Sequence, residues 1–229
     1  MSITNAFKRL HYPTDVIAQC VRWYLAYSLS LRNLEEMMAE RGIQVDHSTL
    51  HRWILKITPI FNKLAFRYKK PVNQFWHMDE TYIKIKGKWY YLYRAIDSTG
   101  KTVDFLLTKR RDMQAARRFF KNAICKHACP IKVTIDKSGA NKKAIESFNV
   151  GFTRYRPITI RQNKYMNNRI EQDHRFIKKR VRAMLGFKTF RSAQIILSGI
   201  ELMHMIRKGQ FNLSKEFQKA LGLLCPKNG

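Results

Sequence analysis

The segment from Phe75 to Asp97, "FWHMDETYIKIKGKWYYLYRAID", decides how this chain is expected to fold. Aromatic and β-branched residues dominate it, which is typical of strands in the middle of a sheet. Two adjacent carboxylates, Asp79 and Glu80, nevertheless stand inside the segment. A carboxylate among apolar neighbours is costly unless it is paired or bound to a cation, so these two acids need a chemical explanation.

The segment and the residues after it predict an antiparallel meander followed by alternating helices and strands. Turns are expected at "KGK" (Lys86–Lys88) and "STG" (Ser98–Gly100). Strands are predicted over 76–86, 89–97, 102–109, 131–136 and 150–160, and helices over 112–128, 138–149, 164–185 and 189–208. This order is that of the ribonuclease-H-like fold, an α/β class in which an open mixed sheet carries helices on both faces.

The residues before the meander are predicted to be helical, as an all-α domain that precedes the sheet domain. Thr14, Ser30 and Asp46 can each cap a helix, and Gly42 can end one. A basic, proline-containing stretch then separates the two patterns. The predicted divisions are a helical DNA-binding domain at 1–68, a linker at 69–73, a ribonuclease-H-like domain at 74–210 and a C-terminal tail at 211–229.

A helix, a short glycine-containing turn and a helix capped by Asp46 predict a helix-turn-helix over about 30–56. In that motif the second helix enters the major groove of DNA, and its early residues face the base edges. Those residues are His47, Ser48, Thr49, His51 and Arg52. The alternative is an ordinary helical hairpin, which needs the same apolar face.

The charge of the chain favours a polyanionic partner. Its 229 residues include 44 Lys and Arg against 16 Asp and Glu, so the formal net charge is +28. Such an excess destabilises a compact state through self-repulsion unless a polyanion relieves it. Nucleic acid is the simplest such partner, because its phosphates release counterions to Lys and Arg. A membrane surface is the alternative, but no polybasic tail stands out.

Cysteine usage and the apolar runs favour the cytoplasm. Four cysteines in a chain of this length do not make a disulfide framework. No signal peptide is recognised, and the apolar run at 193–206 is too short and too interrupted to span a bilayer. That run predicts a helix that closes the domain core or packs on a partner. Cys125, His127 and Cys129 lack a second ligand pair, so buried free thiols are expected there rather than zinc ligands.

Asp79 and Asp136 are the candidate pair of acids in the sheet. Asp79 shares one strand face with Thr81 and Ile83, while Glu80 points to the other face. Asp136 closes its strand after "IKVTI", at the edge where open α/β sheets bind ligands. If the first and fourth strands are parallel neighbours, the two acids lie side by side and repel each other unless a cation sits between them. Mg²⁺ suits such all-oxygen ligands.

Glu171, in the last-but-one predicted helix, is the candidate for a third metal ligand. Arg175 and Lys178 follow it on the same helix face. Two metal ions about 4 Å apart can activate a water or a 3′-hydroxyl for in-line attack on a phosphodiester. Each acid also has a structural reading: Asp79 pairs with a core arginine, Asp136 belongs to a turn, and Glu171 pairs with Arg175. The competing acids are Asp97, Asp104, Glu80 and Asp173.

Three stretches of the chain resemble a known family. They are "WHMDETYIKIKGKWYYLYRAID", "VTIDKSGAN" and "YMNNRIEQDHRFIKKRVRAMLGFKTFRSA". They are similar to the DDE transposases of small bacterial insertion sequences, in the group around the IS-six type, and the resemblance covers nearly the whole chain. The 34 residues between Asp136 and Glu171 match the spacing of that group. Lys178 stands at the family's basic position, seven residues after the glutamate.

The resemblance implies a function as well as a fold. It implies that Asp79, Asp136 and Glu171 are the catalytic acids and hold two Mg²⁺ ions, for which Mn²⁺ can substitute. The implied reaction is 3′-end cleavage and strand transfer, with double-stranded DNA as the substrate, both the terminal inverted repeats and the target. Because a transposase must hold two ends together, a homodimer or higher oligomer is expected, working in the bacterial cytoplasm in association with the nucleoid.

Basic residues after Glu171 are expected to contact DNA. Lys178 is expected to touch a phosphate near the cleaved bond, while Lys179 and Arg180 contact the DNA backbone further out. The DNA-contacting set predicted on this helix is Arg175, Lys178, Lys179 and Arg182. The structural alternative is a solvated basic face.

The aromatic residues of the meander, Trp76, Trp89 and the tyrosines of "YYLY", are expected in the core rather than stacked on bases. Two other functions stay open beside the transposase. One is a non-enzymatic helix-turn-helix regulator whose second domain only oligomerises. The other is a nuclease of the same fold that hydrolyses DNA and never joins it.

Overall fold

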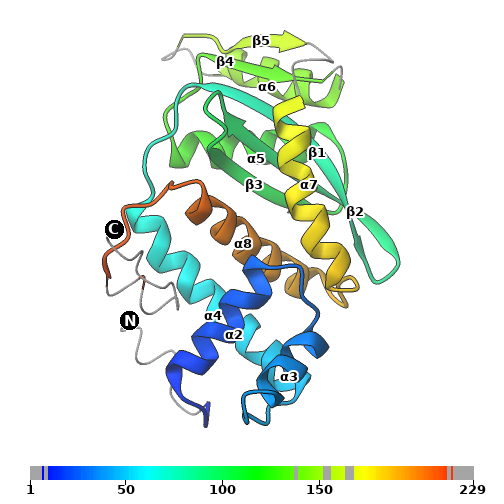
Figure 1. The fold of residues 1–229 in the computed structure, drawn as a ribbon. Helices are drawn as coiled ribbons and strands as arrows, with labels where there is room; N and C mark the ends of the chain where they lie inside the picture. The colour runs from blue at the N-terminus through cyan, green and yellow to red at the C-terminus, as the bar shows by residue number, and fades with distance from the viewer. Residues whose placement is uncertain are drawn as a thin grey trace. The chain divides into compact units, whose positions relative to one another are not determined.

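A five-stranded mixed sheet forms the centre of the segment Pro71–Phe176 (Figure 1). The strands are β1 (Phe75–Ile85), β2 (Lys88–Asp97), β3 (Thr102–Thr108), β4 (Lys132–Ile135) and β5 (Thr159–Gln162). Their order in the sheet is β3-β2-β1-β4-β5. β2 pairs antiparallel with β1 and β3, whereas β4 pairs parallel with β1 and β5. This is the ribonuclease-H-like arrangement, so the predicted fold class and the parallel pairing of the first and fourth strands are confirmed.

This computed structural model describes residues 7, 10–136, 139–151, 156–162, 168–215 and 218. By packing, the chain divides into two units. One unit combines Met1–Lys70 with Ile177–Gly229, and the other is Pro71–Phe176. The final helix therefore packs with the N-terminal helices, whereas the sequence analysis grouped it with the sheet. The functional division of the chain into domains stays a prediction.

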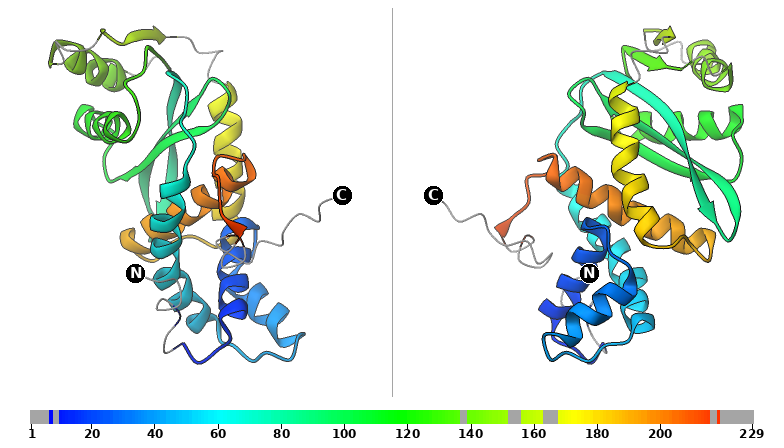
Figure 2. Two further views of the ribbon diagram at one scale, coloured as in Figure 1. Left: turned by 90° about the vertical axis from the view of Figure 1, so that its left-hand side faces the viewer. Right: turned by 45° about the vertical axis from the view of Figure 1, so that its right-hand side comes forward.

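Helices cover both faces of the sheet (Figure 2). They are α5 (Met113–Lys126), α6 (Gly139–Gly151) and the beginning of α7 (Asn168–Ala183). α5 and α6 lie on one face, and α7 crosses the other. The core under α5 and α6 contains Trp76, Met78 and Tyr93 from the strands together with Phe119 and Phe120 from α5. Burial of this set between sheet and helices is the main stabilising contribution in this unit.

The helical unit contains α2 (Thr14–Ala26), α3 (Leu31–Ala39), α4 (His47–Ala65), the short 3₁₀ helix η1 (Phe66–Tyr68), the end of α7 and α8 (Phe190–Arg207). Ser30 caps α3 and Asp46 caps α4, as predicted. α8 packs against α2 and α4, and its Ile196, Ile200 and Met203 are buried. α8 therefore closes the core of its own unit. Neither α8 nor any other helix in the described part of the chain is long and apolar enough to cross a membrane.

One helix prediction was wrong in detail. Pro13 rather than Thr14 precedes α2, and no side chain caps this helix. α4 continues past Pro59, beyond the stretch of about 30–56 predicted as a helix-turn-helix. Phe61, two residues after the proline, is fully buried, and this burial outweighs the backbone hydrogen bond that Pro59 removes.

One strand prediction and one burial prediction were also wrong. The strand predicted over 150–160 begins only at Thr159, because α6 continues to Gly151. Trp76 is buried as expected, but Trp89 is 59% exposed. Trp89 lies near the turn of the β1–β2 hairpin, beyond the last paired residues of β3, so no third strand extends the sheet beside it.

Gly199 allows α8 to lie against both α2 and α4. A Cβ atom at this position would come within 2.7 Å of side-chain carbons of Leu25 and Thr58. We therefore expect Gly199→Ala to lower the free energy of unfolding by about 1–3 kcal/mol, the usual cost of overpacking a core. Chemical denaturation followed by circular dichroism measures this change. Gly151→Ala is the matched control, because nothing lies within 4 Å of the new Cβ there; equal stability of the two variants would contradict the packing argument.

Candidate functional site

Two carboxylates come from neighbouring parallel strands. His77 of β1 pairs with Thr134 of β4, and every pair between these strands has the same offset of 57 positions. That offset also relates Asp79 in β1 to Asp136, which follows directly after β4. The two acids therefore stand at neighbouring positions beside the carboxyl end of β4, the edge at which open α/β sheets bind ligands. Their side chains are 18% and 36% exposed.

The side chain of Asp79 meets α7. Nε2 of His174 lies 3.2 Å from Oδ2 of Asp79. His174 is buried and shares the inward stripe of α7 with Ile170 and Ile177. A ring nitrogen at hydrogen-bond distance restricts the orientation of the carboxylate. His174 was not among the site residues predicted from the sequence, although its spacing from the two isoleucines places it on the core-facing side of the helix.

A buried ion pair holds α7 on the sheet. Arg94 lies directly opposite Asp79 in the β1–β2 register and is fully buried. Its Nη2 atom lies 2.6 Å from Oδ2 of Asp173 in α7. Because a buried guanidinium is costly without a partner, this contact fixes the rotation of α7 about its own axis. Asp173 thus has a structural partner inside the fold.

Glu80 points to the opposite face of the sheet, as the strand alternation predicted. Its carboxylate accepts hydrogen bonds from Nε of Arg111 and, at 2.9 Å, from Nδ2 of Asn141. Burial raises the pKa of Glu80, although the bonds from Asn141 and Arg111 oppose the shift. Arg111 also approaches Asp136, with 3.7 Å between its Nη2 and Oδ2 of the acid. One guanidinium therefore connects buried Glu80 with half-buried Asp136.

The other two competing acids, Asp97 and Asp104, also have structural partners within the fold. Asp97 accepts hydrogen bonds from three backbone amides at 2.9–3.0 Å and so organises the turn between β2 and β3. Asp104 is buried and lies 2.9 Å from Nζ of Lys126. Like Glu80 and Asp173, both acids are held by contacts within the fold.

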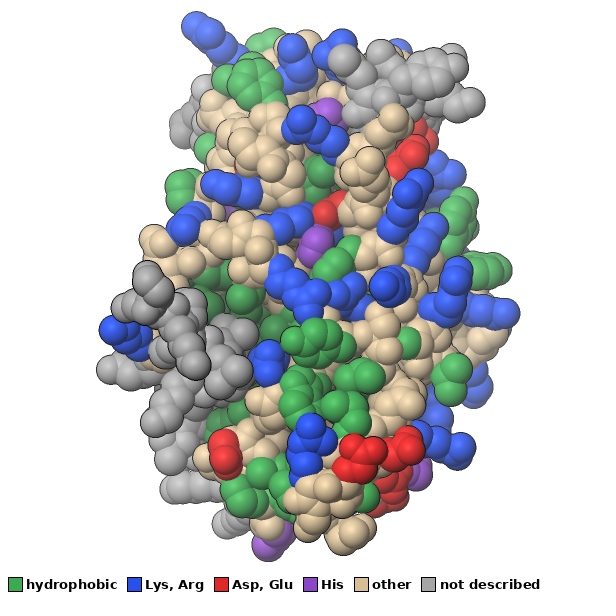
Figure 3. Space-filling model, viewed as in Figure 1, with side chains coloured by type: hydrophobic (Ala, Val, Ile, Leu, Met, Phe, Trp, Pro, Cys, Tyr) green, Lys and Arg blue, Asp and Glu red, His purple; other side chains and the backbone are tan. Residues whose placement is uncertain are grey.

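The exposed face of α7 carries one acidic and several basic side chains. Glu171 lies in the first turn of the helix. The exposed residues predicted to act here are Glu171, Arg175, Lys178, Lys179 and Arg182. Lys and Arg side chains are also widespread on the face of the molecule drawn in Figure 3, where Asp and Glu side chains are few. α7 therefore presents its predicted functional residues outward while His174 and Asp173 point inward.

Arg180 differs from its basic neighbours on α7. It is buried and donates hydrogen bonds to the backbone oxygen of Ala26, from Nε at 3.2 Å and from Nη2 at 2.9 Å. Burial, with a smaller contribution from Arg207, lowers the pKa of Arg180 to about 10. The expected contact of Arg180 with the DNA backbone is therefore wrong: its partner is a carbonyl in the last turn of α2.

The three predicted acids do not converge on one point. Within the described residues, Asp79, Asp136 and Glu171 do not form a group with ligand atoms within 4.8 Å of one another. Asp79 instead contacts His174, and Asp136 contacts Arg111. The donor set nevertheless fits Mg²⁺, because every donor is a carboxylate oxygen and this ion binds through one or two carboxylates together with water and phosphate oxygens.

The residues predicted to face DNA bases lie in the first two turns of α4. His47, Ser48 and Arg52 are exposed, and Thr49 and His51 are half-buried. Nδ1 of His47 lies 3.1 Å from Glu35 and 3.2 Å from Asp46. These three side chains are the group of possible metal ligands found in the described part of the chain. Contact of α4 with DNA stays a prediction that the exposure of these residues permits.

Cysteine chemistry does not define a site. Cys20 is buried, whereas Cys125 is exposed and Cys129 is half-buried, so the burial expected of Cys125 is wrong. Nε2 of His127 lies 3.0 Å from the backbone oxygen of Val103. In the described residues, Cys125, His127 and Cys129 do not form a group of metal ligands. Cys225 lies outside the described residues.

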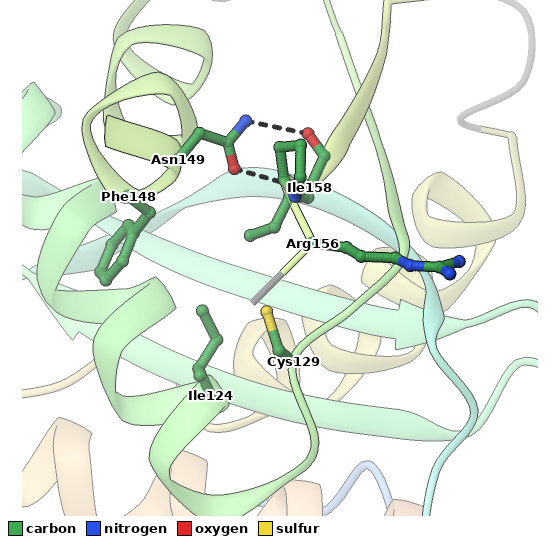
Figure 4. A pocket seen from close by; sticks show the side chains of 7 residues that line it. Ile124, Cys129, Phe148, Asn149, Arg156 and Ile158 are labelled. Atoms are coloured by element: carbon green, nitrogen blue, oxygen red, sulfur yellow. Dashed lines mark hydrogen bonds between the residues drawn. The ribbon is translucent and has the colours of Figure 1, made fainter. Parts of the chain in front are cut away.

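An apolar pocket lies between α5, α6 and the residues before β5 (Figure 4). Its lining consists of Ile124, Cys129, Phe148, Asn149, Arg156, Pro157 and Ile158. Asn149 closes one side, since its side chain donates to the backbone oxygen of Ile158 at 3.0 Å and accepts from the backbone nitrogen at 2.8 Å. None of the three predicted acids lines this pocket, so it is separate from the candidate site.

Removing one partner of the ion pair between Arg94 and Asp173 is predicted to be strongly destabilising. We expect Asp173→Ala to lower the free energy of unfolding by about 3 kcal/mol, because a buried guanidinium loses its carboxylate. Gln172→Ala, at the exposed neighbouring position, is the control. The double variant Arg94→Met/Asp173→Leu should recover most of the loss, because an apolar pair needs no counter-charge. A denaturation midpoint of Asp173→Ala equal to that of the unmodified protein would exclude this role.

The chain matches known transposases over most of its length. A family model described as a DDE domain matches residues 73–210, and one described as the Transposase IS66 family matches residues 9–130. The transposase for the insertion sequence-like element IS431mec of Staphylococcus aureus is 40% identical over 204 residues, which are 89% of each chain. The transposase for IS257 in transposon Tn4003, also from Staphylococcus aureus, has the same identity and coverage.

Solved structures of integrase cores resemble part of the chain more distantly. The HTLV-2 integrase catalytic core domain in complex with magnesium has a TM-score of 0.44 and 17% identity, covering 57% of this chain and 84% of its own. The BIV integrase catalytic core domain has a TM-score of 0.41 and 15% identity, covering 57% and 83%. The fold assignment rests on the strand order and does not need these likenesses. By the match to the DDE domain and the identity to the staphylococcal proteins, this chain belongs to the DDE transposases of bacterial insertion sequences, which are polynucleotidyl transferases.

Proposed function

We propose that this transposase binds the terminal inverted repeats of its insertion sequence, frees 3′-hydroxyls at the ends and joins them to target DNA. The observation that supports this most is the parallel register of β1 and β4, in which Asp79 and Asp136 share the offset of the paired residues. The chemistry needs carboxylates side by side at a sheet edge, and this register supplies two. Glu171 supplies the third from the exposed face of α7.

Asp79, Asp136 and Glu171 hold the divalent cations in this proposal. Two Mg²⁺ ions, for which Mn²⁺ can substitute, would stabilise the attacking and leaving oxygens of an in-line displacement. His174 orients Asp79 through the contact at 3.2 Å. Arg111 orients Asp136 while it is itself held by buried Glu80.

The basic residues of α7 bind DNA phosphates in this proposal. Lys178 lies two helical turns after Glu171 on the same exposed face, so the phosphate it binds is next to the bond that is cut. Arg175, Lys179 and Arg182 extend this contact along the backbone. The early residues of α4 read bases of the terminal repeat in the major groove.

The assembly and the place of action follow from the reaction. A transposase holds both ends of its element during strand transfer, so we propose a homodimer or a higher oligomer bound to two ends. The substrate is bacterial DNA, and the protein therefore acts in the cytoplasm in association with the nucleoid. The formal net charge of +28 supports this association.

Removing an acid should abolish the chemistry and keep DNA binding. We expect Glu171→Gln and Asp136→Asn to lower 3′-end cleavage by more than about a hundredfold, because losing a metal ligand costs more than losing a residue that supports one. EDTA should have the same effect on the unmodified protein. The assay uses a labelled duplex with the terminal repeat and a second DNA as target, with cleavage and joining read on a gel.

Glu146→Gln is the matched control, since Glu146 is an exposed acid paired with Lys142 on α6. If Glu171→Gln cleaves at the rate of the unmodified protein, the catalytic role proposed for Glu171 is wrong. Metal-dependent cleavage without joined product would identify a hydrolytic nuclease, and binding without any metal-dependent product would favour the regulator.

Arg52 should contribute to recognition of the terminal repeat. We expect Arg52→Ala to weaken binding to the repeat about 5- to 150-fold, the value of one base contact by an arginine, with a smaller effect on unrelated duplex. Lys63→Ala, an exposed cation in the last turn of α4, is the control. Equal losses of affinity for repeat and unrelated DNA would show that Arg52 contacts phosphate only.

A further inference from the structure

The outer end of the β1–β2 hairpin presents aromatic rings to solvent. Tyr82 is 48% exposed and Trp89 is 59% exposed. Tyr82 pairs with half-buried Tyr91 across the two strands, and the ring of Tyr82 lies 5.3 Å from that of Tyr91 and 6.3 Å from that of Trp89. Side chains of cross-strand partners lie on the same face of the hairpin. The three rings therefore form one surface, here named the aromatic platform.

The aromatic platform lies on the part of the hairpin that extends beyond the paired residues of the neighbouring strands β3 and β4. β4 pairs with β1 only as far as His77, and β3 pairs with β2 only from Tyr91 inward. On the opposite face of the same segment, Ile83 and Ile85 are buried. Ile83 and Ile85 therefore already contribute apolar side chains from this segment to the core. The exposed rings on the other face are not needed to complete that core.

Cations surround the aromatic platform. Nζ of Lys84 lies 5.6 Å from the centre of the Trp89 ring. Exposed cations also follow in the turn of the hairpin and just after β3, which runs beside Tyr91; they are Lys86, Lys109 and Arg110. The segments 82–91 and 108–111 contain no Asp or Glu. A protein partner fits such a surface poorly, because lysine is depleted from protein interfaces, whereas rings between cations are typical of single-strand binding.

Arg111 connects the aromatic platform with the candidate acids. Its Nη2 atom lies 3.7 Å from Oδ2 of Asp136. Tyr82 follows Glu80 by two positions on the same face of β1. Glu80 accepts a hydrogen bond from Nε of the same Arg111. A strand lying over the rings would continue toward Asp136.

We propose that the aromatic platform of Tyr82, Trp89 and Tyr91 binds unpaired nucleotides of the DNA end next to the bond that is cut. Inside a duplex both faces of a base are covered by its neighbours, whereas unpaired bases expose their faces to stacking rings. Because every base offers a π-face, the site takes single-stranded DNA without strict sequence preference. Lys84 and Lys86 neutralise its phosphates. This inference rests on the proposed function, because it assigns the platform to the same DNA substrate.

Fluorescence anisotropy in EDTA tests the proposal with two probes, a labelled oligothymidylate and a labelled blunt duplex. Trp89→Ala should weaken binding of the oligothymidylate about 5- to 150-fold, the usual value of one base–aromatic stack, and should leave duplex binding unchanged. Trp89→Phe should keep most of the affinity. The control is Phe75→Ala, since Phe75 is 45% exposed in the same strand and has Nζ of Lys132 at 5.9 Å from its ring, but lies outside the platform.

The outcomes separate this inference from the proposed function. Unchanged oligothymidylate binding by Trp89→Ala, or an equal loss for both probes, would overturn the platform. A change of sedimentation coefficient in Trp89→Ala with unchanged binding would identify a contact between copies of the chain and also overturn it. Because the assay contains no metal, Trp89-dependent binding supports the platform even if the unmodified protein makes no cleavage product, a result that would reject only the proposed reaction.

Discussion

Arg94 is a fully buried cation in the middle of the sheet, and its ion pair with Asp173 determines how α7 lies on that sheet. In a helix each residue turns the side-chain direction by a fixed angle. Once Asp173 is held inward, His174 is directed to Asp79, and Glu171 and Lys178 are directed outward. One buried charge pair thus sets the orientation of the inward contact to Asp79 and of the exposed acidic and basic face.

Strand geometry explains how two adjacent acids can lie inside β1. Asp79 and Glu80 point to opposite faces, so their charges are handled by different partners. Asp79 is next to His174 on one face, and Glu80 is bound by Arg111 and Asn141 on the other. Because Arg111 also approaches Asp136, the face opposite α7 contributes to the environment of that acid. Glu80 therefore acts on the site through an arginine, without being one of the predicted ligands.

The sequence was enough to predict the order of strands, the opposite directions of Asp79 and Glu80, and the caps at Ser30 and Asp46, because these depend on local pattern. Arg94 and Arg111 could not be predicted, since their partners lie 79 and 31 residues away in the chain. Arg180 was wrongly assigned to DNA because a basic run does not reveal which member turns inward. Trp89 was wrongly assigned to the core because an aromatic strand pattern does not show where the neighbouring strands end. The roles of the three acids and of the DNA-contacting residues stay predictions.

The parallel register of β1 and β4 also bears on how the chain folds. The meander joins strands that are close in the sequence, whereas β1 and β4 meet only after a crossover through α5, and their paired residues are 57 positions apart. Bringing together residues so far apart in the sequence costs chain entropy before the contacts between them can stabilise the structure. We expect β4 to dock late, which pulsed hydrogen exchange would register as late protection of its amides. A growing or half-folded chain would then carry Asp79 and Asp136 apart, so the proposed cleavage of DNA would become possible only when folding is nearly complete.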